Sequence, residues 1–506
     1  MKSVPKASEG TRGSQFYGEE TLMSFNMKYT SSLARLVVIW KNLSDLSPKA
    51  LTIAMLFTVA ACTADRDEVR SPSQPNIVFI IADDLGWTDV EFHEGNAPTP
   101  NLNRLRSEGM ELKQHYVAPV CSPTRAGFLT GRYWSRFGIT TPINTRGLLF
   151  DTMTLPRLIR DAGYNTAIVG KWHLGSKPEW GPNHFGFDHS YGSLAGGVTP
   201  WSHYYKKGPY SETWHRNGEL ITEEGYVTDL LVKEAVEWIE KQPDDEPFFL
   251  YAPFTAIHLP IREPKEWLDR VPKEIVGEVP RHYAACIMHL DDAVGQIVSA
   301  VDKSGRGDNT LIVFTSDNGG STAENNDTKY PNINDDCPDG PLTGNNLPLR
   351  GQKGELYEGG TRVPTLVRWP GTIEAGSTAE TPVHIVDWMP TFSALSGYNT
   401  DFAKLKWDGV NIGPVLKGEG GLPERALYSA GTRFRSEALR EGDWKLIRFN
   451  LDKEDETRVE LYNIASDPNE KVNLAASQPE RLAQLQAKLI AAAAKDNDSV
   501  VPISED

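Results

Sequence analysis

The chain has few cysteines, four among its 506 residues, and no two of them form the C-x-x-C pair typical of zinc sites. Basic residues are fewer than acidic ones. The chain has 52 lysines and arginines against 68 aspartates and glutamates, which gives a formal net charge of −16. This charge argues against a nucleic-acid backbone as the partner. It also means that any anionic substrate must be captured by local cations, since the field of the whole protein opposes it.

Near its start the chain has an apolar run, residues 50–61, that is too short to span a bilayer comfortably. The run is typical of the apolar part of a secretory signal. It ends in V-A-A-C, which resembles a bacterial lipobox and would make Cys62 the lipidated first residue of the mature protein. Ordinary cleavage after Ala61 is the alternative. We therefore expect a leader and signal segment over residues 1–61 and a tether over residues 62–75.

This leader predicts an exported protein, located in the periplasm or held at the outer membrane of a bacterium as a lipoprotein. We expect contact with the membrane only through the lipid on Cys62.

A chain of this length is expected to form two domains. Five short runs are apolar throughout and rich in β-branched and aromatic residues, the pattern of strands covered on both faces. Segments with a helical pattern separate them. This alternation predicts an α/β domain over residues 76–400, with a largely parallel sheet sandwiched by helices. The expected strands are residues 77–81, 166–169, 247–251, 310–314 and 365–369, and the expected helices are residues 155–162, 226–241 and 281–303.

Beyond residue 400 the pattern changes to four short strands followed by a helix. The runs at 426–428, 436–440, 444–448 and 460–462 predict an antiparallel meander, and residues 478–495 predict the helix. We expect residues 401–506 to form a smaller C-terminal α+β domain. Its helix has apolar side chains at helical spacing, which predicts core packing for Leu482, Leu485, Leu489 and Ile490.

Acidic and amide side chains follow two of the expected strands. The first strand runs into Asp83 and Asp84, and the fourth runs into Asp317 and Asn318. Taken alone, each pair has a structural alternative, a helix N-cap for the first and an ordinary turn for the second. The carboxyl ends of parallel strands meet at one edge of the sheet, where three carboxylates would repel one another and require a cation. Hard oxygen donors suit calcium or magnesium and not zinc or copper.

Basic side chains follow the other expected strands. Lys171 and His173 lie on either side of Trp172, so in an extended segment both would point the same way. The third strand leads into a loop that ends at His258. Singly, a lysine is usually a solvated charge and a histidine a hydrogen-bonded bystander. Together, these residues predict a polar site at one edge of the sheet.

The dodecamer C-S-P-T-R-A-G-F-L-T-G-R at residues 121–132 is the most informative stretch of the chain. Arg125 lies one helical turn beyond Cys121, so a helix that starts at Ser122 or Pro123 would present both residues at its N-terminal end. Backbone N–H groups and the positive end of the helix dipole favour an anion there. For a lone C-x-P-x-R, a small buried cysteine and a surface arginine would be the simpler interpretation.

The dodecamer and four further motifs together resemble the type I sulfatases of the alkaline phosphatase superfamily. The other motifs are N-I-V-F-I-I-A-D-D-L-G, G-K-W-H-L-G, A-I-H-L-P and S-D-N-G-G, in the family's order and approximate spacing between residues 76 and 397. The run L-R-G-Q-K-G-E-L-Y-E-G-G-T-R-V-P is most similar to the branch of arylsulfatase B, N-acetylgalactosamine-4-sulfatase. The resemblance implies an alkaline phosphatase-like fold with a small C-terminal domain.

The resemblance also implies that Cys121 is oxidised to formylglycine by a formylglycine-generating or sulfatase-maturating enzyme. One hydroxyl of the hydrated aldehyde would attack sulfur, and the other would lose its proton and expel sulfate. If Cys62 carries a lipid and Cys121 is oxidised, Cys286 and Cys337 are left, and they either pair or stay as two buried thiols.

The family's other site residues match positions of this sequence one by one. The matching metal ligands imply one calcium ion, and they are Asp83, Asp84, Asp317, Asn318 and an oxygen of the matured Cys121. Arg125 would steady the diol, and Lys171 and Lys353 would bind sulfate oxygens. His258 would protonate the leaving alcohol, and His173 would take the proton whose loss releases sulfate.

The expected function is hydrolysis of sulfate monoesters on a glycosaminoglycan-like or algal sulfated oligosaccharide or polysaccharide. One alternative is a phosphodiesterase or phosphonate monoester hydrolase of the same superfamily. A second alternative is a non-catalytic glycan-binding lipoprotein in which Cys121 stays a thiol.

Overall fold

A large mixed sheet organises the computed structural model, which describes residues 74–330, 335–398 and 402–502. The predicted leader, the lipid site at Cys62, nearly all of the tether and the domain boundary at 400/401 lie outside these residues, and they stay predictions. Within the described residues the sheet has ten strands. In spatial order they are β13 (Ser377–Ala379), β2 (Met110–Leu112), β12 (Leu366–Arg368), β9 (Thr310–Ser316), β1 (Asn76–Ala82), β8 (Phe248–Pro253), β4 (Asn165–Val169), β5 (His189–Ser193), β6 (Trp214–Arg216) and β7 (Glu219–Leu220).

The centre of this sheet is parallel, as the sequence predicts. Strands β9, β1, β8, β4 and β5 all run the same way, so their carboxyl ends lie at one edge. The fifth expected strand, residues 365–369, is shorter than predicted and pairs antiparallel with β9 as β12. Strand β12 also pairs antiparallel with β2, and β6 with β5, so the sheet is mixed on either side of its parallel core.

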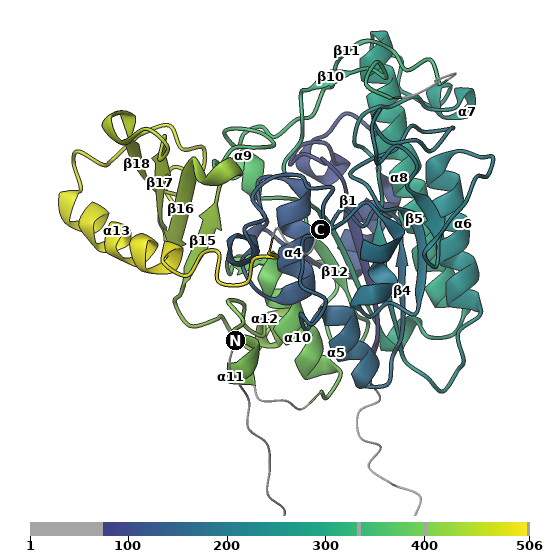
Figure 1. Cartoon of the computed structure of the whole chain (residues 1–506), viewed down its shortest axis with the longest axis horizontal. Coiled ribbons are helices and arrows are strands. Elements are labelled where there is room, and N and C mark those ends of the chain that lie inside the picture. The colour runs from purple at the N-terminus through teal and green to yellow at the C-terminus, as the bar shows by residue number, and fades with distance from the viewer. Residues whose placement is uncertain (1–73, 331–334, 399–401, 503–506) are drawn as a thin grey trace, which may run out of the picture. The chain divides into compact units, whose positions relative to one another are not determined.

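Helices cover both faces of the central sheet (Figure 1). On one face α3 (Pro100–Glu108), α6 (Val227–Glu240) and α8 (Glu278–Lys303) pack against Val78, Ile80 and Ala82 of β1. On the other, α4 (Cys121–Thr130), α5 (Leu155–Asp161) and α10 (Trp388–Leu395) pack against Ile77, Phe79 and Ile81. Successive side chains of a strand point to opposite faces, so one uninterrupted apolar run supplies both cores.

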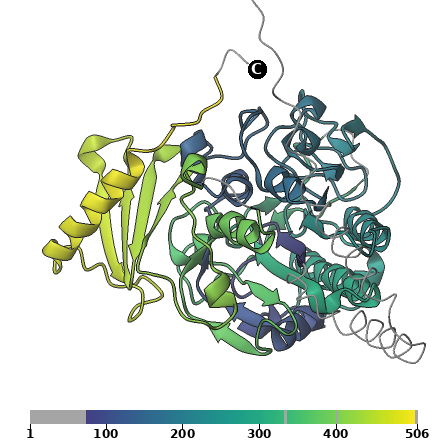
Figure 2. The same ribbon diagram turned by 90° about the horizontal axis from the view of Figure 1, so that it is seen from below.

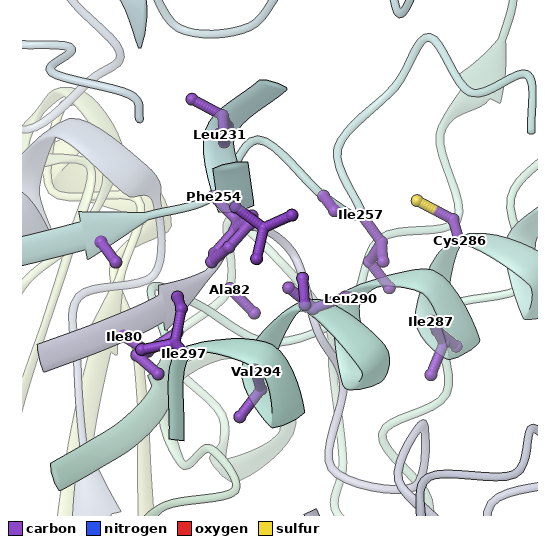
Figure 3. Packing of buried hydrophobic residues seen from close by; sticks show 14 of the residues in the cluster. Ile80, Ala82, Leu231, Phe254, Ile257, Cys286, Ile287, Leu290, Val294 and Ile297 are labelled. Atoms are coloured by element: carbon purple, nitrogen blue, oxygen red, sulfur yellow. The ribbon is translucent and has the colours of Figure 1, made fainter. Parts of the chain in front are cut away.

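Helix α8 shows how closely the first of these cores is packed. Figure 3 shows Leu290 and Ile297 of α8 beside Ala82 and Ile80 of β1, and all four side chains are buried. By length and composition α8 is also apolar enough to cross a membrane, but 78% of its most apolar window is buried inside the protein. Its hydrophobic side chains therefore belong to the core.

The C-terminal residues form a four-stranded antiparallel sheet with one helix across it, as predicted (Figure 2). Leu485 and Leu489 of the helix are buried against the sheet, and Leu482 is partly buried. The core position predicted for Ile490 is wrong, because its side chain is 52% exposed. The elements are β15 (Ala426–Ala430), β16 (Ser436–Glu441), β17 (Trp444–Phe449), β18 (Arg458–Asn463) and α13 (Pro479–Ala493).

The second face of the C-terminal sheet packs on a short segment at residues 356–357. Leu356 and Tyr357 form one cluster with Ala438, Ile447 and Tyr462 of the sheet. Gly354 lines one cavity together with Thr432 and Arg433, so the turn between β15 and β16 lies close to residues 353–354. The remaining short elements are β3 (His115–Tyr116), β10 (Glu324–Asn325), β11 (Gly340–Pro341), β14 (Val383–His384), α7 (Lys265–Leu268), α9 (Glu358–Thr361), α11 (Phe402–Leu405) and α12 (Gly413–Leu416).

Candidate active site

The predicted oxygen donors meet where β1 and β9 end. Asp83 and Asp84 follow β1, Asp317 and Asn318 follow β9, and all four side chains are buried. The backbone N–H of Asp84 donates to Asp317 Oδ1 at 3.2 Å, and Asn318 Nδ2 donates to Asp84 Oδ1 at 2.8 Å. Neither pair is a helix N-cap, since no helix begins beside them. Residues more than 230 positions apart in the sequence therefore share one buried polar cluster.

Cys121 is the first residue of α4, whose N-terminus points at this cluster. The ligand atoms of Cys121, Asp83 and Asp317 all lie within 4.8 Å of one another. Arg125, one turn further along α4, donates to Asp317 Oδ2 at 2.8 Å and to the backbone carbonyl of Lys171 at 2.7 Å. The thiol therefore lies among the oxygen donors, as the sequence predicts.

Lys171 and His173 follow β4 and reach the same cluster. Lys171 Nζ forms a fully buried ion pair with Asp83 Oδ2 at 2.5 Å. The extended conformation expected for this segment is wrong, because His173 has the left-handed backbone value φ 59°. The His173 ring instead lies over Gly196, where a Cβ atom would come within 2.3 Å of Nε2. Only glycine at position 196 leaves room for the ring in this orientation.

Lys353 and His258 complete the cluster from two loops. Lys353 Nζ lies 2.6 Å from Asp84 Oδ1, and His258 Nε2 lies 3.9 Å from Asp84 Oδ2. The other ring nitrogen of His258, Nδ1, lies 2.6 Å from the backbone carbonyl of Leu259, so it carries the proton of that hydrogen bond. All ten predicted site residues therefore converge on one place.

Basic side chains balance much of the negative charge of the cluster, whereas the sequence analysis considered the three carboxylates without these partners. Three carboxylates are paired with three basic side chains, in the pairs Asp83–Lys171, Asp84–Lys353 and Asp317–Arg125. Repulsion among the carboxylates is thus partly offset without a metal ion. Burial opposes ionisation of Asp84, yet the Lys353 ammonium and the hydrogen bonds from Lys353 and Asn318 hold its pKa well below the ordinary value. Burial and the neighbouring Asp317 raise the pKa of Asp83 to about 8 despite Lys171.

Two orphaned oxygens show that the donor set fits a hard cation. Asp83 Oδ1 and Asn318 Oδ1 are buried and have no hydrogen-bond partner within the described residues. Each such group costs about 1–3 kcal/mol unless something binds it. A divalent cation that prefers oxygen ligands would satisfy both and would favour the ionised form of Asp83.

The two histidines are held neutral by their surroundings. Burial and Lys171 hold the pKa of His173 well below its usual range, and burial and Lys353 do the same for His258. His173 Nδ1 is buried without a partner among the described residues, so a proton acceptor is available there. An anionic substrate next to His258 would favour its protonated form.

Sequence reasoning missed two residues at the rim. Tyr205 and Lys206 interact electrostatically with Cys121, Lys171 and Lys353. Burial and the like charges of Lys329 and Lys353 lower the pKa of Lys206. The only signal in the sequence is the aromatic run P-W-S-H-Y-Y at residues 200–205, which includes Tyr205 and matches no motif. Cys286 and Cys337 are free and buried, so the second of the two expected alternatives holds within the described residues.

The fold is that of an α/β enzyme. The site combines a helix N-terminus with several basic side chains, an arrangement that is typical of enzymes that bind a small anion. The sulfatase family model matches residues 75–398, and a model described as N-sulphoglucosamine sulphohydrolase, C-terminal, matches residues 352–496. The chain belongs to the sulfatase family, and it is a sulfuric ester hydrolase.

Individual relatives agree with the family. Arylsulfatase J of Mus musculus is 29% identical over 85% of this chain and 77% of its own length, and N-acetylgalactosamine-6-sulfatase of Homo sapiens is 30% identical over 81% and 83%. The crystal structure of Ps i-CgsB in complex with k-i-k-neocarrahexaose superposes with a TM-score of 0.75 and 31% identity, covering 86% of this chain and 96% of that one. Placement in the N-acetylgalactosamine-4-sulfatase branch stays a prediction.

Proposed function

We propose that the protein hydrolyses sulfate monoesters on a sulfated oligosaccharide or polysaccharide, with Cys121 oxidised to formylglycine and one calcium ion held by Asp83, Asp84, Asp317 and Asn318. The observation that carries this proposal is the position of Cys121. Its sulfur lies at the N-terminus of α4, within 4.8 Å of carboxylate oxygens of Asp83 and Asp317. A buried thiol with a purely structural role needs none of these neighbours.

The matured side chain and the cation supply chemistry that the encoded residues lack. Hydrated formylglycine offers one hydroxyl as the nucleophile and a second hydroxyl through which sulfate can leave. A calcium ion held by Asp83, Asp84, Asp317 and Asn318 would supply polarisation of a sulfate oxygen and a lower pKa for a hydroxyl bound to it. The lysines of the site would bind the sulfate group. Lys171 and Lys353 can move from their carboxylates to sulfate oxygens once calcium balances the acidic charge. Arg125, fixed by Asp317, orients the side chain of residue 121.

The two histidines are suited to opposite proton transfers. His258 Nδ1 is engaged with the Leu259 carbonyl, so Nε2 is the atom that would deliver a proton to the leaving oxygen. Lys353 places positive charge beside that oxygen. His173 Nδ1, buried and without a partner among the described residues, would accept the proton whose loss releases sulfate.

A carbohydrate substrate is supported by what the relatives are named for. Their names include N-acetylgalactosamine-6-sulfatase, and one solved neighbour, 31% identical, is bound to k-i-k-neocarrahexaose. We propose the class of substrate, a sulfated carbohydrate, and not a particular sugar or sulfate position.

The test is a comparison of sulfate and phosphate esters on protein co-expressed with a sulfatase-maturating enzyme. We expect kcat/KM for 4-nitrophenyl sulfate to exceed that for 4-nitrophenyl phosphate and bis-4-nitrophenyl phosphate by about tenfold or more, since the proposed site has ligands for one metal ion beside a cationic pocket. A panel of desulfated and sulfated oligosaccharides would then identify the sugar. Equal or higher rates on the phosphate esters would favour the phosphodiesterase alternative.

Replacing His258 with alanine is expected to affect esters according to their leaving groups. A sugar alkoxide needs a proton to leave, so kcat should fall by about 10²–10⁴-fold on a sulfated sugar. A 4-nitrophenolate leaves without one, and the loss on the aryl ester should be at least tenfold smaller. Initial rates on both esters measure the difference. His215→Ala is the matched control, because this buried histidine bonds Gly192 and Ser190 outside the cluster. Equal losses on both esters would exclude His258 as the acid.

We also propose that the protein is exported, with residues 1–61 removed and lipid on Cys62, as the V-A-A-C sequence indicates. Cell fractionation of the native host tests this, with Cys62→Ser as the variant that should move from the membrane to the periplasmic fraction. Recovery of the unaltered chain in the cytoplasm would refute export.

A further inference from the structure

The turn that joins β15 to β16 borders a cavity of about 480 Å³. Two arginines of this turn, Arg433 and Arg435, line it, together with the hydroxyl-bearing residues Thr141, Thr432 and Ser436. No acidic side chain lines this cavity within the described residues. In a chain with a net charge of −16, such a lining is unusual and suits an anion on a hydroxyl-rich ligand.

The cavity adjoins the catalytic cluster through two short segments of chain. Gly354, which lines it, follows Lys353 directly and donates its backbone N–H to the Pro119 carbonyl at 2.7 Å, two residues before Cys121. Pro142, on the same wall, precedes Ile143, whose N–H donates to Ser122 Oγ at 3.2 Å. A saccharide held at Cys121 therefore has this cavity beside it.

The two arginines differ in what they contact. Arg435 forms an ion pair with Asp452 at 2.9 Å, so its charge is already matched. Arg433 is exposed and has no hydrogen bond or ion pair from its side chain to the described residues. Phe434 packs against the core, which holds the turn in place, and both Arg433 and Phe434 have left-handed backbones with φ 57° and 55°. Such strain in non-glycine residues is concentrated at functional positions.

We propose that this cavity is a subsite for a second anionic substituent of the carbohydrate, a sulfate or carboxylate on a residue next to the ester being cleaved, and that Arg433 binds it. The inference rests on the proposed function and narrows its substrate class to polyanionic saccharides. The guanidinium presents a planar set of donors that matches an oxyanion, and the neighbouring hydroxyls match sugar hydroxyls. Arg433 is thus a specificity-determining residue that does not touch the reacting atoms.

The experiment measures binding of two probes to the mature protein by isothermal titration calorimetry and by inhibition of 4-nitrophenyl sulfate hydrolysis. Inhibition by inorganic sulfate reports on the catalytic cluster, because this ion is too small to span both places, whereas sucrose octasulfate, a polysulfated disaccharide, can reach both. In Arg433→Ala the Kd for sucrose octasulfate should rise about tenfold or more, the usual effect of losing a charge-assisted hydrogen bond. The Kd for inorganic sulfate and the KM for the aryl ester should stay within twofold.

Matched variants make the outcome decisive. Arg435→Ala removes an arginine from the same turn, but one already paired, and should change the Kd for sucrose octasulfate less than threefold. Arg433→Lys should recover part of the lost affinity. An Arg433→Ala protein that binds sucrose octasulfate as well as the unaltered protein overturns the inference, and so does equal weakening for both probes. Because calorimetry needs no turnover, this result is readable even if the aryl ester is not hydrolysed, which would instead count against the proposed function.

Discussion

Replacing Cys121 with alanine is expected to reduce sulfate ester hydrolysis by three orders of magnitude or more, the usual scale for loss of a catalytic nucleophile. The residue lies among the ligand atoms of Asp83 and Asp317, and alanine cannot be oxidised to an aldehyde. Burial raises the pKa of the Cys121 thiol, so an unoxidised cysteine would be a poor nucleophile at this position. Rates on 4-nitrophenyl sulfate measure the loss. Mass spectrometry of the tryptic peptide covering residues 114–125 measures the conversion, since the aldehyde is lighter than the thiol.

The matched control for this prediction is Cys286→Ala. Cys286 is a buried free thiol on α8, at the edge of the apolar cluster in Figure 3 and beside Glu263, so its loss should reduce stability and leave most of the activity. Activity that persists in Cys121→Ala would refute the nucleophile. A peptide of unchanged mass from fully active protein would refute oxidation while keeping residue 121 in the mechanism.

The central fold was predictable because its signal is local. An apolar run such as residues 77–81 is covered on both faces, and the core residues of β1 alternate between two clusters as the run implies. The antiparallel pairing of β12 was not predictable from its own residues. The direction of a strand depends on the path of the chain that connects it to its neighbour in the sheet, and the apolar run carries no information about that path. Ile490 shows a second limit. It follows Leu489 directly, so its side chain points about 100° around α13 from that buried residue and is 52% exposed.

The sequence predicts which residues form the site, but it does not predict which of them contact one another. Asp83, Asp317 and Lys171 each follow a strand of the parallel core, so topology alone brings them to one edge. The three ion pairs could not be predicted from the spacing of residues in the sequence. They depend on the length and conformation of each basic side chain. Arg433 carried no signal at all, because it is a lone arginine in a turn and its cavity is assembled from distant segments.

Replacing Asp317 with asparagine is expected to remove both calcium and activity. The change deletes a carboxylate that faces Cys121 and Asp83, and it weakens the hold on Arg125. Loss of one charged ligand and of the orientation of Arg125 should lower kcat/KM by about 10²–10³-fold, the range seen when a preorganised electrostatic contact is removed. Metal analysis of the dialysed protein should show about one calcium ion per chain before the change and much less after it. Chelation of the unaltered protein should abolish activity, and added calcium should restore it.

Asp89→Asn separates metal binding from the general effect of losing a buried acid. Asp89 is buried near the same edge, but it accepts hydrogen bonds from Tyr283 and Gly86 and belongs to neither group of ligand atoms around Cys121 or His258. Burial raises the pKa of Asp89 to about 7, so a neutral amide is a mild replacement near neutral pH. This variant should keep its calcium and lose only stability. If Asp317→Asn keeps its full calcium content while Asp89→Asn loses it, the ligand set proposed here is wrong, whatever the activities are. If both keep calcium and only Asp317→Asn is inactive, Asp317 acts through Arg125 alone and is not a metal ligand.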